Sequence, residues 1–241
     1  MRMYQWTDDM IRLMHDASER TDFYALLARQ IVQALGGEAR AAPMRLCDAG
    51  CGLGYLSLEL ARCCQQVTAV DVSAPSLEVL RQNLESRRIA NVEPLRMSVW
   101  DMPRDMRFDA MVFCLFGQVD EVLRAARGHC GQAVIVKKTW TTRRFALKPD
   151  VPERDTLDET TNLLEQNGLA FTRSFVSLTL DQPFRCIEDA MLFFRLYGHA
   201  DAETEVNEQE VRRRLTETGD PEFPWLLPVP KRLGVLTVNL S

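Results

Sequence analysis

The segment Asp48-Ala49-Gly50-Cys51-Gly52-Leu53-Gly54 carries the clearest chemical signal in this chain. It follows a short apolar run and precedes a helical pattern, so we predict a loop that joins a strand to a helix. Glycine at alternate positions lets the backbone turn sharply and approach a ligand closely. The helix N-terminus beyond the loop offers free N–H groups and the positive end of a dipole. This design predicts a cofactor site at the carboxyl end of the strand.

The loop departs from the G-x-G-x-x-G pattern of dinucleotide-binding folds. Counting from Gly50, the position of the third glycine holds Tyr55. The acid before the loop, Asp48, would repel a pyrophosphate. It is compatible with a cationic ligand, because it can order the loop or meet a ligand ammonium. A nicotinamide-dependent oxidoreductase is therefore disfavoured.

Strand and helix patterns alternate around this loop. The predicted strands are Met44–Cys47, Val67–Val72, Val92–Val99, Phe108–Phe116, Gln132–Lys137, Phe171–Leu180 and Leu233–Leu240. The helical patterns between them are Tyr55–Cys64, Ser76–Arg88, Asp120–Arg127 and Thr156–Asn167. The early strands are apolar almost throughout, as expected when helices cover both faces of a parallel sheet. The pattern predicts a doubly wound α/β fold with a mostly parallel sheet.

Two further regions flank this alternation. Helices over Thr7–Ala17 and Thr21–Leu35 predict an N-terminal helical cap, residues 1–38, before a main domain of residues 39–241. Residues 182–231 form a predicted helical insertion between the last two strands, which can act as a lid or a partner surface. Its aromatic helix, Ile187–Leu196, is expected to be core; an acceptor wall or a homodimer face remains open.

Composition excludes some classes of function. The length of 241 residues suits a single α/β domain with a cap. No apolar run approaches the roughly 18 residues of a membrane span, and Met1–Asp9 lacks the apolar core of a secretory signal. We expect a cytoplasmic protein with reduced cysteines and no metal site, because the cysteines form no CxxC pairs. The net charge of −5 argues against a broad nucleic-acid surface.

In its strand–loop–helix context, the D-x-G-x-G-x-G segment resembles motif I of the class I S-adenosylmethionine-dependent methyltransferases. The resemblance extends over about residues 44–138. It implies a seven-stranded methyltransferase fold, with S-adenosylmethionine as cofactor and S-adenosylhomocysteine as product. The loop residues that it assigns to the cofactor are Asp48, Gly50, Gly52, Gly54 and Tyr55.

Later strand ends supply the other expected cofactor contacts. Asp71, 21 positions after Gly50, ends the second strand, where an acid can accept hydrogen bonds from ribose hydroxyls, with Val72 beside it. In the family an acid after the third strand reads the adenine. That position falls on Ser98 here, and Asp101 is its alternative. Further candidates are Val99 and Trp100 for adenine, and Cys114, with Phe116 and Gly117 after it, for the reactive end of the cofactor.

Methyl transfer depends chiefly on proximity and alignment. A general base is needed only when the acceptor must lose a proton. Family analogy places His15 over the cofactor cleft, as a candidate base or as a structural or surface residue. Tyr4 and Trp6 either close over the cofactor or pack the cap. The fourth strand is not followed by a [DN]-P-P-[YF] sequence, which argues against methylation of amino groups on DNA bases.

The acceptor is expected at the end of the fifth strand. Lysines and arginines alternate with Trp140 and Phe145 there, and strand ends face the crevice in this architecture. Lys138, Trp140 and Arg185 are the candidates for binding a small anionic or aromatic acceptor. The alternative is a solvated basic loop offset by the acidic stretch Asp201–Glu210. A non-catalytic S-adenosylmethionine-binding module or partner subunit is the alternative function.

Overall fold

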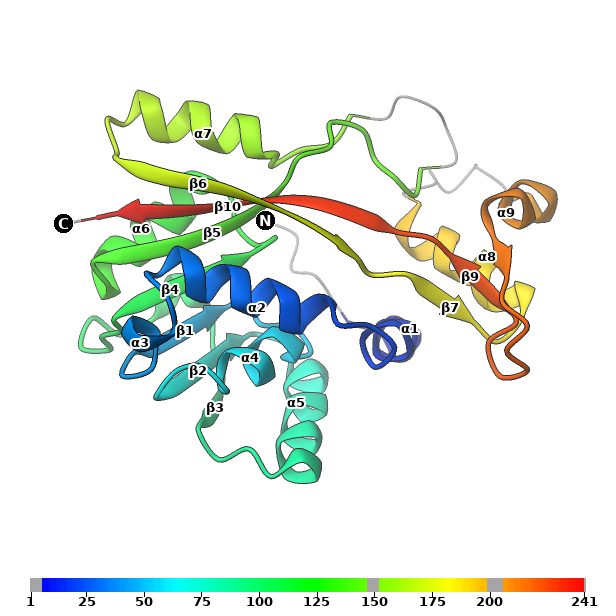
Figure 1. Cartoon of the computed structure of the whole chain (residues 1–241), viewed down its shortest axis with the longest axis horizontal. Coiled ribbons are helices and arrows are strands. Elements are labelled where there is room, and N and C mark those ends of the chain that lie inside the picture. Colours follow the sequence, from blue (N-terminus) through cyan, green and yellow to red (C-terminus); the bar gives the residue numbers. More distant parts are fainter. Residues whose placement is uncertain (1–5, 147–151, 199–205, 241) are drawn as a thin grey trace.

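A computed structural model describes residues 6–146, 152–198 and 206–240 of the chain. Its main sheet has seven strands in the order β3-β2-β1-β4-β5-β10-β6 (Figure 1). These are β1 (Arg45–Ala49), β2 (Gln66–Asp71), β3 (Val92–Arg96), β4 (Ala110–Cys114), β5 (Gln132–Lys138), β6 (Phe171–Thr179) and β10 (Pro230–Asn239). The first five pair in parallel, and β10 runs antiparallel to both of its neighbours, β5 and β6. All seven predicted strands are present, which confirms the expected fold class.

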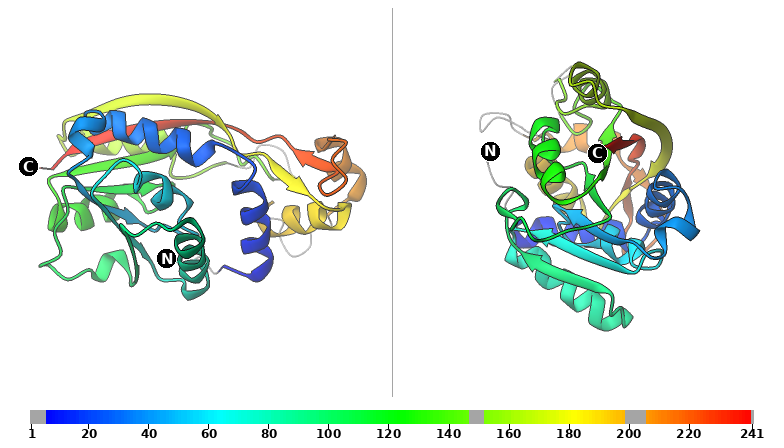
Figure 2. Two further views of the ribbon diagram at one scale, coloured as in Figure 1. Left: turned by 60° about the horizontal axis from the view of Figure 1, so that its bottom comes forward. Right: turned by 90° about the vertical axis from the view of Figure 1, so that its left-hand side faces the viewer.

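Helices cover both faces of this sheet (Figure 2). On one face, α2 (Phe23–Ala34), α4 (Tyr55–Leu60) and α5 (Ala74–Arg87) bury their apolar sides against the strands. On the other face, α6 (Val119–His129) and α7 (Leu157–Gln166) enclose a second apolar cluster. The central strands are buried on both faces, which explains their continuous apolar sequences.

The two N-terminal helices have different surroundings. Helix α2 contacts α4, β6 and β10, and the short α3 (Glu38–Ala41) packs on it, so α2 shares the core of the sheet. Helix α1 (Asp8–Ser18) instead contacts β7 and α8 of the insertion. Figure 2 shows α1 standing between the main sheet and the insertion. Only α1 therefore lies across the end of the sheet where the strands finish.

The insertion is a small unit with its own sheet. Strands β7 (Gln182–Phe184), β9 (Trp225–Leu227) and β8 (Thr216–Glu217) form a three-stranded antiparallel sheet beside α8 (Ile187–Tyr197) and α9 (Glu208–Arg214). The aromatic residues of α8 pack into its core together with Leu13 of α1. The prediction of helices was correct but incomplete, because strands of two or three residues are too short to show a period.

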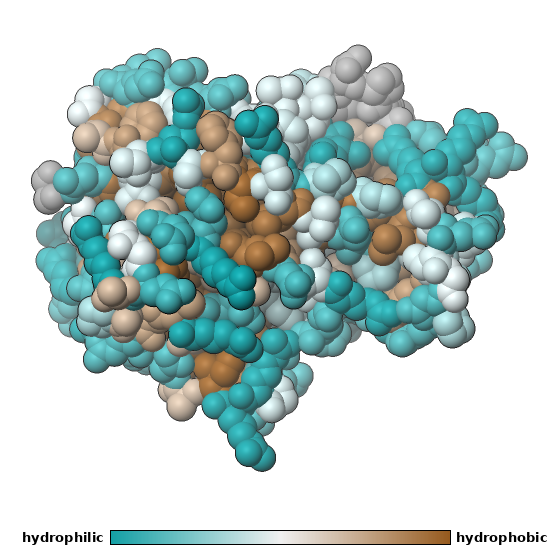
Figure 3. Space-filling model, in the orientation of Figure 1, coloured by the Kyte–Doolittle hydropathy of each residue, from teal (hydrophilic) through white to brown (hydrophobic). Residues whose placement is uncertain are grey.

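The surface is largely hydrophilic on the face shown in Figure 3, with hydrophobic side chains exposed toward the middle. Exposed hydrophobic residues on elements of this region include Leu26 of α2 and Phe175 of β6. Of the helices in the described parts of the chain, none is long and apolar enough to cross a membrane.

Candidate cofactor and acceptor site

The glycine loop between β1 and α4 adopts a left-handed backbone. The φ angle is +73° at Gly50, +55° at Gly52 and +77° at Gly54, so a side chain at any of them would be strained. The N–H groups of Gly50 and Cys51 both donate to the carbonyl oxygen of Val70, at 2.8 and 3.0 Å. These bonds hold the loop against the end of β2, at the carboxyl edge of the sheet.

Asp71 ends β2 and faces this loop. One carboxylate oxygen accepts a hydrogen bond from Gly52 N–H at 2.9 Å, and the other accepts one from Ser73 N–H at 2.9 Å. A carboxylate oxygen has two lone pairs, so each retains capacity for a further donor. Asp71 is half-buried and the adjacent Val72 is exposed. The predicted ribose acid thus lies beside the glycine loop with acceptor capacity left.

Asp48 is only 2% exposed, near the end of β1. Its carboxylate accepts a 2.6 Å hydrogen bond from the Ser57 hydroxyl of α4. Burial raises the pKa of Asp48 to about 6; the Ser57 hydrogen bond opposes this shift and the charge of Asp71 adds to it. The carboxylate links the strand before the loop to the helix after it. Of the two roles considered for Asp48, these contacts support ordering of the loop.

Aromatic rings lie directly against the loop backbone. An added Cβ at Gly50 would come within 2.4 Å of the Phe116 ring, and one at Gly52 within 3.2 Å of the Trp6 indole. Phe116 stacks on Trp100, with ring centroids 5.5 Å apart and planes 6° apart. Glycine is therefore required here for close approach of flat groups as well as for backbone conformation. Tyr4, paired with Trp6 in the prediction, lies outside the described residues.

The backbone around Phe116 is strained. Leu115 has φ +54°, which is rare for a bulky residue, and Gly117 has φ +70°. The buried Lys137 ammonium donates to the Gly117 carbonyl at 2.6 Å and so fixes this turn. Strain of this kind is concentrated at ligand sites. From the sequence, Phe116 was placed at the end of a strand but was assigned no contact with the loop.

The residues expected to face adenine begin the short 3-10 helix η1 (Val99–Asp101). The Ser98 hydroxyl accepts a hydrogen bond from Trp100 N–H at 3.2 Å, which caps this helix. The Val99 side chain is buried in the cluster under α6. Trp100 stacks one ring face on Phe116. It is 37% exposed, which makes its side chain the most accessible among Ser98, Val99 and Trp100.

His15 meets Tyr55 at the start of α4. Its Nδ1 lies 2.6 Å from the Tyr55 hydroxyl oxygen, and the Tyr55 ring stacks on Tyr24 with centroids 5.5 Å apart. Burial raises the pKa of Tyr55 to about 12, so its hydroxyl keeps its proton at neutral pH. His15 itself is exposed on α1. Helix α1 is thus tied to the residue that directly follows the glycine loop.

Cys114 ends β4 and is half-buried. Burial raises the pKa of its thiol to about 12; the charge of Asp48 adds to the shift, and Lys231 and Lys137 oppose it. The thiol therefore stays protonated at neutral pH. It offers a small, polarizable surface at the end of the strand rather than a nucleophile.

The charges of Lys138 and Arg185 are balanced within the protein. The Lys138 ammonium lies 2.9 Å from a carboxylate oxygen of Glu153. The Arg185 guanidinium binds Asp16 of α1 at 2.8 Å and Glu222 at 2.7 Å. Arg185 therefore ties the insertion to α1. These two predicted acceptor contacts do not converge on one open anion site.

Trp140, the third predicted acceptor residue, is half-buried and packs against the core cluster under α2, α4 and α5. Arg144 lies over its ring, with the guanidinium carbon 4.8 Å from the ring centroid. Lys231, at the start of β10, was not singled out from the sequence. No motif marks Lys231 in the sequence, because it lies at the end of the insertion and far along the chain from the other site residues.

The acidic surroundings of the loop suit a positively charged ligand. Asp48 and Asp71 raise the cost of further negative charge, as the pKa of Asp48 shows. A ligand with a positive sulfur and an ammonium lowers the free energy needed to keep these carboxylates ionised, whereas a pyrophosphate raises it. The accessible Trp100 ring and the acceptor capacity of Asp71 also suit an adenosine group. The residues present therefore fit S-adenosylmethionine.

Comparisons with known proteins agree with this geometry. Residues 46–132 match the family described as a methyltransferase domain. No curated protein matches the chain. Among solved structures with a similar fold, the YcgJ protein of Bacillus subtilis is 14% identical, with 90% of this chain and 97% of that chain covered and a TM-score of 0.56. The magnesium protoporphyrin IX methyltransferase of Synechocystis PCC 6803, with bound S-adenosylhomocysteine, is 13% identical, with 98% of this chain and 89% of that chain covered and a TM-score of 0.52. The geranyl diphosphate C-methyltransferase of Streptomyces coelicolor A3(2) is 15% identical, with 90% of this chain and 79% of that chain covered and a TM-score of 0.52.

The resemblance seen in the sequence is thereby confirmed. The matched residues 46–132 contain the glycine loop, Asp71 and the end of β4. At these identities the structural likenesses establish the fold, and the domain match establishes the kind of domain. Residues 46–132 thus carry a methyltransferase domain, and the sheet that contains them has the fold of the class I S-adenosylmethionine-dependent methyltransferases.

Proposed function

We propose that the protein transfers the methyl group of S-adenosylmethionine to a small acceptor and releases S-adenosylhomocysteine. The observation that carries this proposal is the meeting of Asp71 with the left-handed glycine loop, through the 2.9 Å bond from Gly52 N–H. S-adenosylmethionine, when bound, supplies a methyl group that its positive sulfur already activates. The residues of the chain have to bind the cofactor and the acceptor, align them and exclude water. Proximity and alignment can lower the barrier by roughly 7–11 kcal/mol.

The cofactor contacts follow from the arrangement of the loop. Gly50, Gly52 and Gly54 let the ligand approach the backbone, and Asp71 accepts hydrogen bonds from its hydroxyl groups. Asp48 orders the loop, in keeping with its burial and its bond to Ser57. The remaining proposed contacts are Tyr55, Val72, Ser98, Val99, Trp100 and Cys114.

The acceptor is proposed to be a small molecule with an anionic or aromatic group. Two of the similar structures are named for small substrates, magnesium protoporphyrin IX and geranyl diphosphate. Trp140 offers an aromatic wall just after the end of β5. An acceptor anion at Lys138 or Arg185 would have to replace carboxylates that are already bound to them.

A base is required only for acceptors that lose a proton, and we assign that role to His15. It requires the tautomer in which Nδ1 carries the proton and donates it to the Tyr55 oxygen, which leaves Nε2 free to accept a proton. The 2.6 Å separation of Nδ1 from that oxygen shows the hydrogen bond, and the tautomer of His15 sets its direction.

Calorimetric titration with S-adenosylhomocysteine tests the cofactor assignment. Asp71→Ala should weaken binding by roughly tenfold or more, because charge-assisted hydrogen bonds contribute about 1.5–3 kcal/mol each. Asp22→Ala is the matched control, because Asp22 is exposed and its side chain caps no backbone group of α2. Preferential binding of NADH, or unchanged affinity in Asp71→Ala, would contradict the assignment. Release of S-adenosylhomocysteine with candidate acceptors then separates an enzyme from a binding module.

A further inference from the structure

The cations beside the acceptor end of the crevice fall into two groups. Lys138 and Arg185 are paired with carboxylates, as described above. Arg144 and Lys231 are different: within residues 6–146, 152–198 and 206–240, no carboxylate forms an ion pair with either side chain. Arg144 and Lys231 are therefore positive charges at this end of the crevice that the described protein does not balance.

Lys231 is turned toward the core at the beginning of β10. It lies opposite Leu178 of β6, two residues before Leu233, and alternate residues of a strand share a face. Leu178 and Leu233 belong to the cluster that contains Phe23. The Lys231 ammonium is 5.3 Å from the centroid of the Phe23 ring, a cation–π contact. The half-buried ammonium thus lies on the face of the sheet that α2 covers.

Arg144 reaches the same place from the loop after β5. Burial lowers the pKa of Lys231 to about 8; the charge of Arg144 lowers it further, and Cys114 acts in the opposite direction. Burial also lowers the pKa of Arg144. Two cations that repel each other in a partly desolvated site lower the stability of the empty protein, and an anion between them reverses this effect.

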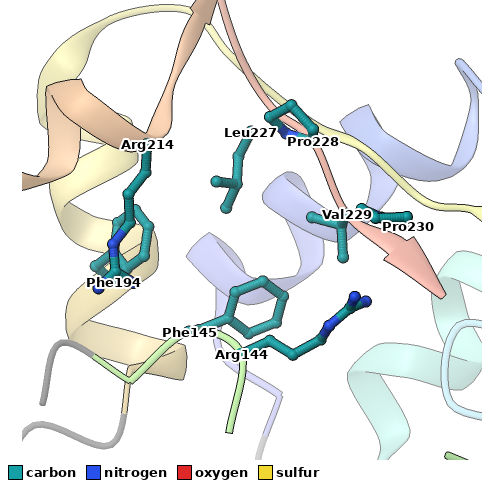
Figure 4. A pocket seen from close by; sticks show the side chains of 8 residues that line it. All are labelled: Arg144, Phe145, Phe194, Arg214, Leu227, Pro228, Val229 and Pro230. Atoms are coloured by element: carbon teal, nitrogen blue, oxygen red, sulfur yellow. The ribbon is translucent and has the colours of Figure 1, made fainter. Parts of the chain in front are cut away.

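A cavity of about 130 Å³, lined by Arg144 and Arg214 and otherwise by apolar side chains, reaches to Pro230, the residue before Lys231. Figure 4 shows Arg144 and Phe145 facing Val229 and Pro230, with Phe194 across the cavity. Arg214 also lines the cavity, but its guanidinium binds Glu210 at 3.0 Å and the Ala146 carbonyl at 3.1 Å. Arg144 is therefore the cation of this cavity that has no carboxylate among the described residues, and Lys231 directly follows Pro230.

We propose that Arg144 and Lys231 bind the anionic group of the acceptor, a carboxylate or phosphate monoester on an apolar body that packs against Trp140 and the cavity walls. The proposal rests on the proposed function, because it assigns the acceptor of the same site. It differs from the sequence-based expectation in the residues that bind the anion. The guanidinium fork and the ammonium supply charge-assisted hydrogen bonds, and the aromatic rings beneath both cations hold them in place.

The test uses benzoate and phenyl phosphate as probes, with benzamide as the neutral counterpart of benzoate. Each is titrated into the full-length protein with and without S-adenosylhomocysteine. We expect one or both anions to bind and benzamide to bind at least roughly tenfold more weakly. Arg144→Gln and Lys231→Met should each weaken anion binding roughly tenfold without changing the affinity for S-adenosylhomocysteine. Whichever probe binds more tightly identifies the anion as carboxylate or phosphate.

Arg232→Gln is the matched control. Arg232 is the residue next to Lys231, is exposed, and its guanidinium carbon lies 5.0 Å from the centroid of the Phe175 ring. It should leave anion affinity unchanged. Equal binding of benzoate and benzamide, or loss of anion binding in Lys138→Gln but not in Arg144→Gln, would overturn the proposal. Anion binding without any affinity for S-adenosylhomocysteine would instead contradict the proposed function and leave the anion site standing.

Discussion

Asp48→Asn should stabilise the unliganded protein at neutral pH. Asp48 is 2% exposed and bears a charge whose main favourable contact is the 2.6 Å hydrogen bond from Ser57. Asparagine keeps an oxygen that can accept this bond and removes the buried charge. The buried charge before the glycine loop lowers the folding stability, and the substitution measures by how much.

The magnitude follows from the pKa of Asp48. Burial raises it from an ordinary 3.8 to about 6, and each pKa unit corresponds to about 1.36 kcal/mol. The ionised carboxyl therefore costs up to about 3 kcal/mol of folding free energy. Because the folded pKa is the higher one, the neutral carboxyl stabilises the fold fully below about pH 4, and this contribution is lost as pH rises through about 6. The new amide N–H₂ needs an acceptor, so we expect a net gain of roughly 1–3 kcal/mol at pH 7.

Urea unfolding at several pH values checks this expectation. The difference between Asp48→Asn and the unsubstituted protein should grow from pH 4 to pH 7. Ser57→Ala, which removes the stabilising hydroxyl, should be destabilising at pH 7, by about 1–3 kcal/mol. A difference that does not depend on pH, or that shrinks between pH 4 and pH 7, would refute the reasoning that Asp48 is ionised at a cost. Asp48→Asn should also weaken S-adenosylmethionine binding, because the charge that favours a cation is gone.

Two substitutions test the geometry of the site further. Gly50→Ala requires a left-handed alanine whose Cβ lies within 2.4 Å of the Phe116 ring. The substitution should lower the free energy of unfolding, measured by thermal unfolding, by at least about 1–2 kcal/mol. It should also abolish S-adenosylhomocysteine binding. Gly128→Ala is its control, because an added Cβ meets nothing within 4 Å on α6, and normal cofactor binding should persist. His15→Gln should lower kcat roughly 100-fold or more for a proton-losing acceptor and leave cofactor affinity unchanged; Tyr55→Phe should lower it less. An equal loss with an acceptor that releases no proton would point to a structural role for His15.

Much of the site was visible in the sequence because it is local. The glycine loop lies within seven consecutive residues, and its conformation depends on the absence of side chains at three of them. Asp71 ends the next strand, and parallel strands that start from the same edge bring their carboxyl ends together. The sequence could not show that Asp71 accepts a bond from Gly52 N–H or that Phe116 covers Gly50, because these contacts depend on side-chain packing.

The acceptor end depended on contacts between distant segments. The basic stretch after β5 looked like one anion site, but Lys138 pairs with Glu153, and Arg185, 47 positions after Lys138, pairs with Asp16 and Glu222. Ion pairing requires that two charges meet within about 4 Å, and no pattern along the chain reports this distance. Because these two cations are paired, Arg144 and Lys231, which form no ion pair with a described carboxylate, are better candidates for binding an anion.

The sequence by itself determined the element types, the glycine loop and the methyltransferase domain, because periodicity and backbone freedom are properties of short segments. The tertiary structure alone decided that β10 lies between β5 and β6 in antiparallel orientation, and that β7, β8 and β9 form a second sheet. Strand pairing depends on which apolar faces can be buried together, and that burial involves all elements of the chain at once. It is this pairing that brings Lys231 of the last strand over the Phe23 ring of α2.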